Sequence, residues 1–308
     1  MNALLYWLGK VLVTSIQMLP LRMVARLRRM GGALAWKVDR RHRAVAIDNL
    51  TACFGKERSA DEIHELAREH FKRLGETYCC AIKTAGMSDE GLRNHLEIVG
   101  RDKLQSAAGE FRSAVFAVGH FGNFELYPHS KIVLPGFQFA STYRALNQRG
   151  LNRLLLELRQ GSGAWLFERR MDGDALRAAM THQKLILGLL SDQHAGQHGV
   201  WLPFFGRECS TTTAPAVFAL RYKLPLYTAI CYRTALAHWQ IEVGDEIPTI
   251  VDGQRRDPAA IMLDVNRAFE AAIRRDPANW FWVHKRWKPG STQGRKALAA
   301  AKPNHVSA

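Results

Sequence analysis

The sequence lacks the cysteine pattern of a disulfide framework or of a cysteine-based zinc site. Its 308 residues contain five cysteines, an odd number, and no pair has the C-x-x-C spacing. Even numbers of cysteines at regular spacings mark small disulfide-bonded domains, and closely spaced pairs mark zinc sites. We therefore predict unpaired thiols, which favours a reducing compartment.

Three motifs of common enzyme classes are also missing. The chain has no G-x-S-x-G nucleophile elbow, no P-loop and no G-x-G-x-x-G fingerprint. Without them the sequence gives no support to a serine hydrolase of the α/β-hydrolase type, a nucleotide-driven enzyme or a dinucleotide-dependent enzyme. No cofactor is predicted.

Acidic residues are scarce beside basic ones, 28 against 43, and the net charge is +15. The excess lies at the two ends: residues 1–60 hold eleven basic and three acidic residues, and residues 285–308 hold six basic residues and no acid. The middle has no long basic stripes with interleaved aromatics, which are typical of nucleic-acid channels. We therefore predict no nucleic-acid partner, and favour an anionic membrane surface, a phosphorylated substrate or an acidic protein.

The first segment is apolar apart from Lys10, the one charge between Asn2 and Leu21. About 20 helical residues extend roughly 30 Å and could cross a bilayer, yet a lysine near the middle costs roughly 2.5–3.5 kcal/mol. One helical face is polar and the other apolar: Tyr6, Lys10, Thr14 and Gln17 against Leu4, Leu5, Leu8, Val11, Leu12 and Ile16. This pattern predicts a helix that lies in the membrane interface or tilts into one leaflet.

Basic residues follow this apolar run, which favours the cytoplasmic leaflet with its anionic lipids. They are Arg22, Arg26, Arg28, Arg29, Lys37, Arg40, Arg41 and Arg43. A cleaved signal peptide is not expected, because the charge follows the apolar run and no A-x-A site is evident. Residues 1–30 are thus predicted to be a membrane-anchoring helix with its basic flank; a core helix of a soluble domain is the alternative.

The rest of the chain alternates short apolar runs with helical patterns. Strands are predicted at 114–118, 139–143, 165–167, 185–190, 228–233 and 239–243, and helices at 61–95, from about Phe124, and at 151–160, 174–180, 213–222 and 258–274. Ser59 and Glu62 resemble a capping box before the first of these helices. The alternation predicts an α/β fold with a mixed, mostly parallel central sheet flanked by helices, in one domain over residues 31–290. Residues 291–308 are predicted to be a disordered tail.

His120 directly follows a predicted buried strand and opens the segment His120-Phe121-Gly122-Asn123-Phe124-Glu125. Reactive groups in such sheets gather at the carboxyl ends of strands. Glu125 is expected to hydrogen-bond one imidazole nitrogen, which leaves the other free to take a proton from a hydroxyl. This pair would be the base and orienter of a catalytic triad without an enzyme nucleophile, so that the substrate hydroxyl attacks an acyl donor. The spacing alone is equally compatible with a capping or surface histidine.

A second segment offers a different chemistry. Asp192, His194 and His198 have a D-x-H-x3-H spacing that could bind a metal. Two histidines in a glycine-rich loop are more often solvated or in contact with a ligand, and we predict no metal site. A metal-dependent hydrolase built on these three residues and a non-catalytic membrane-associated binding protein stay as alternatives.

The HFGNFE segment resembles the H-x4-D/E motif of the lysophospholipid acyltransferase superfamily. The whole chain is similar to the branch that adds secondary acyl chains to lipid A, the lauroyl and myristoyl transferases. Four further segments carry the resemblance: RRHRAVAIDNLTACF (40–54), STYRALNQRGLNRLL (141–155), DQHAGQHGVWLPFFG (192–206) with Thr211, and WFWVHKRWK (280–288). They cover the chain to about residue 288.

The resemblance implies an acyltransferase domain over residues 31–290, with His120 as general base and Glu125 as its orienter. It implies an acyl donor held as a thioester on acyl carrier protein, a small acidic protein, and a phosphorylated glucosamine disaccharide lipid as acceptor. It also implies that cations near the base bind the phosphate. These would be Arg144 and Arg169, while Asp192 would hold Arg144 or the sugar.

Gly122 and Asn123 are expected to shape the turn, and backbone N–H groups at the start of the next helix to stabilise the oxyanion. The sequence thus predicts a monotopic enzyme at the cytoplasmic face of a Gram-negative inner membrane that forms an acyloxyacyl ester. Other acceptors stay open: a lysophospholipid, an aminolipid or a pigment-like polyene.

Overall fold

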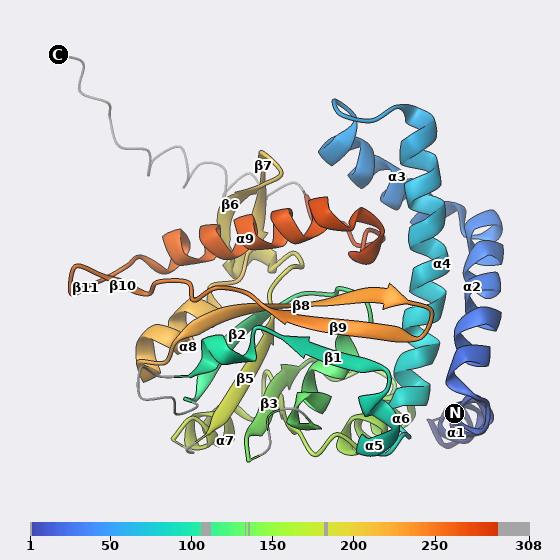
Figure 1. Cartoon of the computed structure of the whole chain (residues 1–308), viewed down its shortest axis with the longest axis horizontal. Coiled ribbons are helices and arrows are strands. Elements are labelled where there is room, and N and C mark those ends of the chain that lie inside the picture. The colour runs from blue at the N-terminus through green and yellow to red at the C-terminus, as the bar shows by residue number, and fades with distance from the viewer. Residues whose placement is uncertain (1, 106–111, 133, 135, 182–183, 289–308) are drawn as a thin grey trace.

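A central seven-stranded sheet organises the protein (Figure 1). The computed structural model describes residues 2–105, 112–132, 134, 136–181 and 184–288. The strand order is β1-β9-β8-β2-β5-β3-β4, and each neighbouring pair is parallel except β8 with β9. The strands are β1 (Leu96–Val99), β2 (Ala114–Val118), β3 (Gln138–Tyr143), β4 (Trp165–Glu168), β5 (Leu185–Leu190), β8 (Leu226–Ala235) and β9 (His238–Val243). The predicted mixed, mostly parallel sheet is confirmed.

Strand β2 shows why the sheet is covered on both faces. All five of its residues are buried. Val115 and Ala117 belong to one core cluster, and Phe116 and Val118 to another, because successive side chains of a strand point to opposite faces. Helix α9 (Pro258–Arg275) packs on the Val115 side through Phe269. The apolar run predicted as a buried strand therefore separates two cores.

Further helices connect and cover the strands. These are α5 (Asp89–Arg93), α6 (Arg149–Gln160), α7 (Gly173–Ala179) and α8 (Ala214–Tyr222), with the 3-10 segments η1 (Arg101–Leu104), η2 (Phe124–Ile132), η3 (Gly196–His198) and η4 (Pro277–Asn279). Two hairpins extend from this body: β6 (Val200–Phe204) with β7 (Arg207–Thr211), and β10 (Ile250–Val251) with β11 (Gln254–Arg255). The helix predicted after Phe124 is present as a 3-10 helix. Pro128 lies inside it, and a proline there removes a backbone donor.

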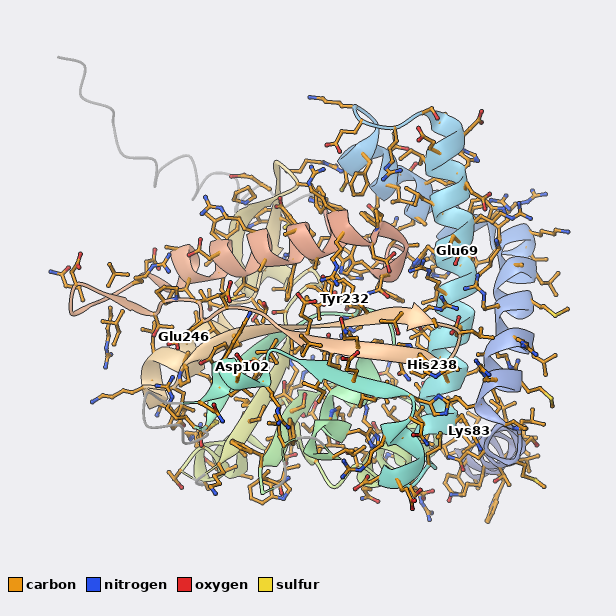
Figure 2. The ribbon with its side chains drawn as sticks, in the orientation of Figure 1. Glu69, Lys83, Asp102, Tyr232, His238 and Glu246 are labelled. Atoms are coloured by element: carbon orange, nitrogen blue, oxygen red, sulfur yellow. The ribbon has the colours of Figure 1, made fainter. Side chains whose placement is uncertain are left out.

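Four helices form the N-terminal part: α1 (Asn2–Met18), α2 (Leu21–Val38), α3 (Arg40–Phe54) and α4 (Ala60–Thr84). Helices α2 and α4 stand side by side at one end of the sheet (Figure 1). Figure 2 labels two α4 residues, Glu69 and Lys83, at different heights along this contact. Glu69 accepts from Arg29 of α2 at 2.9 Å, and Lys83 donates to the Gln17 carbonyl of α1 at 2.5 Å. The predicted capping box at the start of α4 is confirmed, because the Ser59 side chain accepts from the Glu62 N–H and Glu62 accepts from the Ser59 N–H.

Helix α1 turns its polar face toward the protein and its apolar face outward. Tyr6 and Lys10 both donate to the Glu157 carboxylate of α6, at 3.0 Å, and Gln17 donates to the Ile82 carbonyl of α4 at 3.0 Å. The predicted apolar face is mostly exposed: Leu4, Leu8, Val11 and Leu12, together with Trp7, are each more than half exposed. Ile16 departs from this division, because it is buried against the core.

Within the described residues, none of the helices is at once long and apolar enough to cross a membrane. The N-terminal helix itself is present, and its membrane association stays a prediction at this point. The predicted division after residue 30 falls within α2. The predicted disordered tail, 291–308, lies outside the described residues.

The close packing of α2 on α4 depends on Gly32, so Gly32→Ala should destabilise the protein. A Cβ at this position would lie 2.2 Å from the Phe71 carbonyl oxygen, and the helices must separate to admit it. We expect a loss of about 1–3 kcal/mol in the free energy of unfolding, measured by urea denaturation.

Gly31→Ala is the matched control, because a Cβ there meets no atom within 4 Å. At an exposed helical position it should leave the stability unchanged or raise it by about 0.5–1 kcal/mol. Equal stability of the two variants would contradict the proposed role of Gly32 in helix packing.

Candidate functional site

The carboxyl ends of β2 and β5 bring the two central residues of the site together. His120 lies two residues beyond the end of β2, and Asp192 two residues beyond the end of β5. The two strands are parallel neighbours, so their ends meet at the same edge of the sheet. Residues 72 positions apart in the sequence are thereby placed in contact.

His120 and Asp192 form a buried, fully bonded pair. The His120 Nδ1 lies 2.8 Å from Asp192 Oδ1, and the His120 backbone N–H donates to Asp192 Oδ2 at 2.8 Å. Trp280 Nε1 donates to the same Oδ2 at 2.8 Å. Because the carboxylate accepts at Nδ1, the imidazole proton is held there and Nε2 is left as the basic nitrogen. That nitrogen has the Gln193 Nε2 at 3.5 Å.

The environment of Asp192 keeps it ionised. Only 1% of its surface is exposed, and burial by itself favours the protonated form. The attraction of His120, the two hydrogen bonds from that residue and the one from Trp280 outweigh burial and lower the pKa of Asp192 to about 2. The carboxylate is therefore charged at neutral pH and can stabilise an imidazolium when His120 takes up a proton.

Glu125 does not make the predicted contact with His120. Its carboxylate accepts from Arg159 of α6 at 2.9 Å and 2.5 Å, as a two-point ion pair. The predicted orienter of the imidazole is thus wrong in identity: Asp192, across the sheet edge, occupies Nδ1. The 3-10 segment η2 begins at Phe124, and Glu125 on it is engaged by α6.

Gly122 and Asn123 shape the turn after β2, as predicted. Gly122 has a φ of +47°, and a Cβ there would lie 2.5 Å from the Cys231 carbonyl oxygen. Its N–H donates to the Asn279 carbonyl at 3.0 Å, so this donor is already committed. Asn123 is fully buried, and its Nδ2 donates to Thr84 Oγ1 at 3.4 Å. Asn123 therefore supports the turn from inside the core.

Arg144 and Arg169 lie at the same edge of the sheet but farther along it. Both are exposed and follow β3 and β4 directly. At about 4.8 Å per strand, two strand steps put Arg144 about 10 Å from the end of β2, and three put Arg169 about 14 Å away. Neither is paired with Asp192, whose bonds go to His120 and Trp280. The predicted partnership of Asp192 with Arg144 is wrong.

The metal alternative finds no support among the described residues, where no cluster of three His, Cys, Asp or Glu could hold an ion. Asp192 is engaged by His120 and Trp280. The backbone N–H of His194 donates to His284 Nε2 at 3.1 Å. Burial lowers the pKa of His284 to about 4, so its Nε2 is an unprotonated acceptor. The His198 side chain lies outside the described part of the structure.

Three contributors were not predicted from the sequence. Trp280 is buried in the core, and its Nε1 donates to Asp192. Arg286 is fully buried and donates to the Gln193 and Ser210 carbonyls, which holds the segment after β5. Arg233, near the end of β8, lines the same pocket as His120. Arg233 could have been predicted as a site residue, because the strand predicted at 228–233 ends on it.

A small pocket of about 20 Å³ borders His120, lined also by Gly122, Phe124, Arg233 and Phe281. We call it the His120 pocket. Phe124 is shared with a second space of about 90 Å³, lined almost entirely by apolar side chains. This space, the apolar cavity, runs beneath the sheet and includes Phe116, Val118, Leu104, Leu134, Ile186, Leu190, Ile241 and Val243. Glu125 and Arg159 are the charged residues that line it. The arrangement places His120 close to an apolar space whose lining suits a hydrocarbon chain.

Comparison with known protein families gives a match over most of the chain. Residues 1–289 match the family described as bacterial lipid A biosynthesis acyltransferase. The chain is 26% identical over 300 residues to the lipid A biosynthesis palmitoleoyltransferase of Escherichia coli strain K12, which covers 92% of this chain and 91% of that protein.

Two further relatives are more distant. The chain is 24% identical over 298 residues to the lipid A biosynthesis acyltransferase of Haemophilus influenzae, covering 92% of this chain and 90% of the relative. It is also 24% identical over 253 residues to the phosphatidylinositol mannoside acyltransferase of Mycolicibacterium smegmatis, covering 81% of each.

The ionised Asp192 should stabilise the fold, so Asp192→Asn should lower the free energy of unfolding at pH 7 by about 1–3 kcal/mol. The pKa of Asp192 is lower in the folded than in the unfolded chain. The carboxylate's contribution is therefore fully present above about pH 4 and is lost as the pH falls toward 2. Urea denaturation at pH 7, 4, 3 and 2 should show a difference between the variant and the native chain that shrinks in the last steps.

Asp174→Asn is the matched control, because the Asp174 side chain is 94% exposed in its ion pair with Arg177. Solvent screening limits such a pair to less than about 1 kcal/mol. A difference for Asp192→Asn that stays constant down to pH 2 would contradict the assigned ionisation.

Proposed function

Because the chain belongs to the family of bacterial lipid A biosynthesis acyltransferases, we propose that His120 is the general base of an O-acyl transfer onto a lipid A precursor. Membership of this family makes the protein an acyltransferase that acts on a lipid acceptor. The observation that carries the proposal is the Nδ1 bond from His120 to the buried Asp192 carboxylate, because it leaves Nε2 basic beside an open pocket.

In the proposed reaction, Nε2 of His120 removes the proton of the acceptor hydroxyl while its oxygen attacks the thioester carbon. The carbonyl oxygen becomes an oxyanion, and Asp192 stabilises the imidazolium. Collapse of the intermediate breaks the C–S bond, and His120 returns its proton to the departing thiolate. The ester and the free thiol are the products, and His120 ends neutral.

The apolar cavity is the proposed chamber for the donor acyl chain. Its lining of Phe, Val, Leu and Ile side chains suits a hydrocarbon, and burial of each CH₂ group contributes about 0.8 kcal/mol. Its Phe124 wall is in contact with His120, with ring centroids 4.7 Å apart. In this proposal Glu125 and Arg159 act as a pair that fixes the cavity wall, and Asp192 replaces Glu125 as the orienter of the base.

The proposed donor is the acyl thioester of acyl carrier protein, an acidic protein. Exposed arginines along the carboxyl edge of the sheet, Arg144 and Arg169, support this choice because they present positive charge near the reacting groups. Complementary charge speeds the encounter of such partners. The same two side chains are candidates for binding the acceptor phosphates, since a guanidinium binds phosphate with two hydrogen bonds.

The proposed site of action is the cytoplasmic face of the inner membrane, reached by monotopic binding. Helices α1 and α2 carry many exposed apolar side chains, which together we call the membrane face: Leu4, Trp7, Leu8, Val11, Leu12, Met23, Leu27, Met30 and Leu34. Exposed apolar side chains in such number on two adjoining helices suit contact with a membrane. Exposed Arg22, Arg26 and Lys37 border it, which suits anionic lipids.

A second acceptor class is supported by one comparison. The relative from Mycolicibacterium smegmatis is named for a phosphatidylinositol mannoside. Another glycolipid is therefore the alternative acceptor, and the same base and donor chemistry would serve it.

Mass spectrometry of membrane lipids tests the function directly. A deletion strain should accumulate a lipid A precursor that lacks one acyl chain, and expression of the native gene should restore the missing chain. His120→Ala should not restore it, because loss of a general base lowers the rate by about 10²–10⁴-fold.

His64→Ala is the control, because this histidine lies exposed on α4 and does not line the His120 pocket. It should restore the missing chain fully. Lipids without a missing acyl chain in the deletion strain would refute the lipid A acceptor, and normal restoration by His120→Ala would refute the assigned base.

Membrane binding should depend on the membrane face. Leu8→Glu with Val11→Glu replaces two residues that are 60% and 64% exposed, so the fold should tolerate both. We expect binding to vesicles of anionic phospholipids, measured by flotation, to fall at least tenfold, because each apolar side chain loses roughly 1.5–3 kcal/mol of burial.

Ile250→Glu with Val251→Glu provides the control on β10. These residues are 52% and 47% exposed and lie on a distant hairpin, so vesicle binding should stay unchanged. Equal loss in both double variants would show that added negative charge, rather than the membrane face, governs binding.

A further inference from the structure

The proposed reaction brings two hydrocarbon chains to His120, and the apolar cavity is assigned to only one of them. In an acyloxyacyl ester the accepting hydroxyl lies on the third carbon of a fatty chain. Two hydrocarbon chains therefore leave the reacting atoms, the donor chain and the rest of the acceptor chain. If the apolar cavity holds the donor chain, the acceptor chain needs a second apolar path that reaches His120.

A second groove lies between α2 and α4. It has a volume of about 470 Å³ and is lined on α2 by Gly31, Gly32 and Ala35 and on α4 by Phe71, Leu74 and Tyr78. We call it the α2–α4 groove. Its α4 wall runs from Phe71 to Cys79, about 12 Å at 1.5 Å per residue.

The α2–α4 groove reaches the catalytic base. Leu74 and Phe281 line both this groove and the His120 pocket. The Phe281 ring lies 5.7 Å from the His120 ring and 6.5 Å from the Tyr78 ring, centroid to centroid. A chain that follows the groove past Tyr78 thus arrives beside His120. Phe124, whose ring contacts His120, lines both the apolar cavity and the His120 pocket, so both apolar spaces adjoin this pocket.

The outer end of the groove meets the proposed membrane face. Gly31 is exposed on α2, between Met30 and Leu34, both of which are more than 60% exposed. Arg28, Asp39 and His42 line the groove as well. His42 Nδ1 lies 2.7 Å from Asp39 Oδ2, so Arg28 is the lining residue that supplies positive charge for an anionic head group. An occupant can therefore enter from the lipid phase without crossing water. This continuity favours a lipid chain over a protein segment.

From these observations we propose that the α2–α4 groove binds the distal part of the acceptor's hydroxyacyl chain. The proposal rests on the proposed function, because it assigns the acceptor side of the same reaction. Glycine at position 31 keeps the groove open: a Cβ there meets no atom within 4 Å, so a larger side chain would enter empty space rather than displace the helices. Position 31 therefore allows the groove to be filled without a clash in the packed core.

The test compares Gly31→Trp with the native enzyme on two synthetic phosphorylated glucosamine disaccharides in detergent micelles. One carries 3-hydroxytetradecanoyl chains and the other 3-hydroxybutanoyl chains, so both offer the same hydroxyl and only the first has a long tail. We expect kcat/KM of the native enzyme to be at least tenfold higher for the long acceptor. Gly31→Trp should lower the long-acceptor value at least tenfold and so remove most of that preference.

Ala44→Trp is the matched control, because Ala44 is exposed on the neighbouring helix α3 and does not line the groove. It should leave both kcat/KM values unchanged. Thermal unfolding of all three proteins checks that the tryptophans leave the fold intact. Gly31→Ala adds only a methyl group and should keep the long-acceptor preference. The loss in Gly31→Trp is then due to the bulk of the side chain and not to the replacement of glycine in the helix.

The outcomes separate the two proposals. A native enzyme that acylates neither disaccharide refutes the proposed acceptor, and the groove assignment with it. A native enzyme that acylates both equally well, or a Gly31→Trp enzyme that keeps the native preference, refutes the groove alone. A change of oligomeric state in Gly31→Trp, seen by light scattering, would also overturn the assignment, because it would identify a second copy of the chain as the occupant.

Discussion

The buried Asp192 carboxylate is the constraint on which the rest of the site depends. A charge with 1% of its surface exposed is tolerated only when its hydrogen-bonding capacity is met, and three donors meet it. These donors come from the turn after β2 and from Trp280 in the C-terminal segment. The carboxylate thus ties the C-terminal segment to the sheet edge, and Arg286 reinforces the same connection by bonding the Gln193 and Ser210 carbonyls. The same hydrogen bonds therefore orient His120 and anchor the last described segment of the chain.

The sheet could be predicted from the sequence because its strands are nearly continuous apolar runs, as burial on both faces requires. The partner of His120 could not. Reasoning along the chain favours the carboxylate five residues away, whereas the observed one comes from an adjacent strand 72 residues away, and only the strand order makes them neighbours. The β6–β7 hairpin was missed for a local reason. Its turn uses Phe205 and Gly206, both with positive φ, and a phenylalanine there gives no turn signal.

The first helix shows a different limit of sequence reasoning. The division into a polar and an apolar face was predictable from the 3.6-residue period. The period does not tell which of the two faces contacts the protein, and a helix on a folded domain usually packs with its apolar face inward. Here the polar face packs inward, because the Glu157 carboxylate of α6 accepts from both Tyr6 and Lys10. Lys10, in the middle of the helix, would raise the free energy of insertion if the helix crossed a bilayer. In the structure it instead bonds to Glu157 and helps to hold the helix on the protein with its apolar face outward.

In the proposed reaction, the hydrocarbon chains of the two substrates approach one imidazole by separate paths. The sheet edge, with exposed Arg144 and Arg169, faces the proposed acidic donor, and the apolar cavity lies beneath the same strands. The helix pair α2–α4 stands at the end of the sheet (Figure 1), and Gly31, which is exposed beside Met30 of the proposed membrane face, lines the groove between the two helices. Phe124 of the apolar cavity and Phe281 of the α2–α4 groove both lie against His120, at 4.7 Å and 5.7 Å between ring centroids. In the proposed reaction the donor thioester and the acceptor head group share the arginine-bearing edge of the sheet, and their hydrocarbon chains take separate paths, one into the apolar cavity and one into the α2–α4 groove.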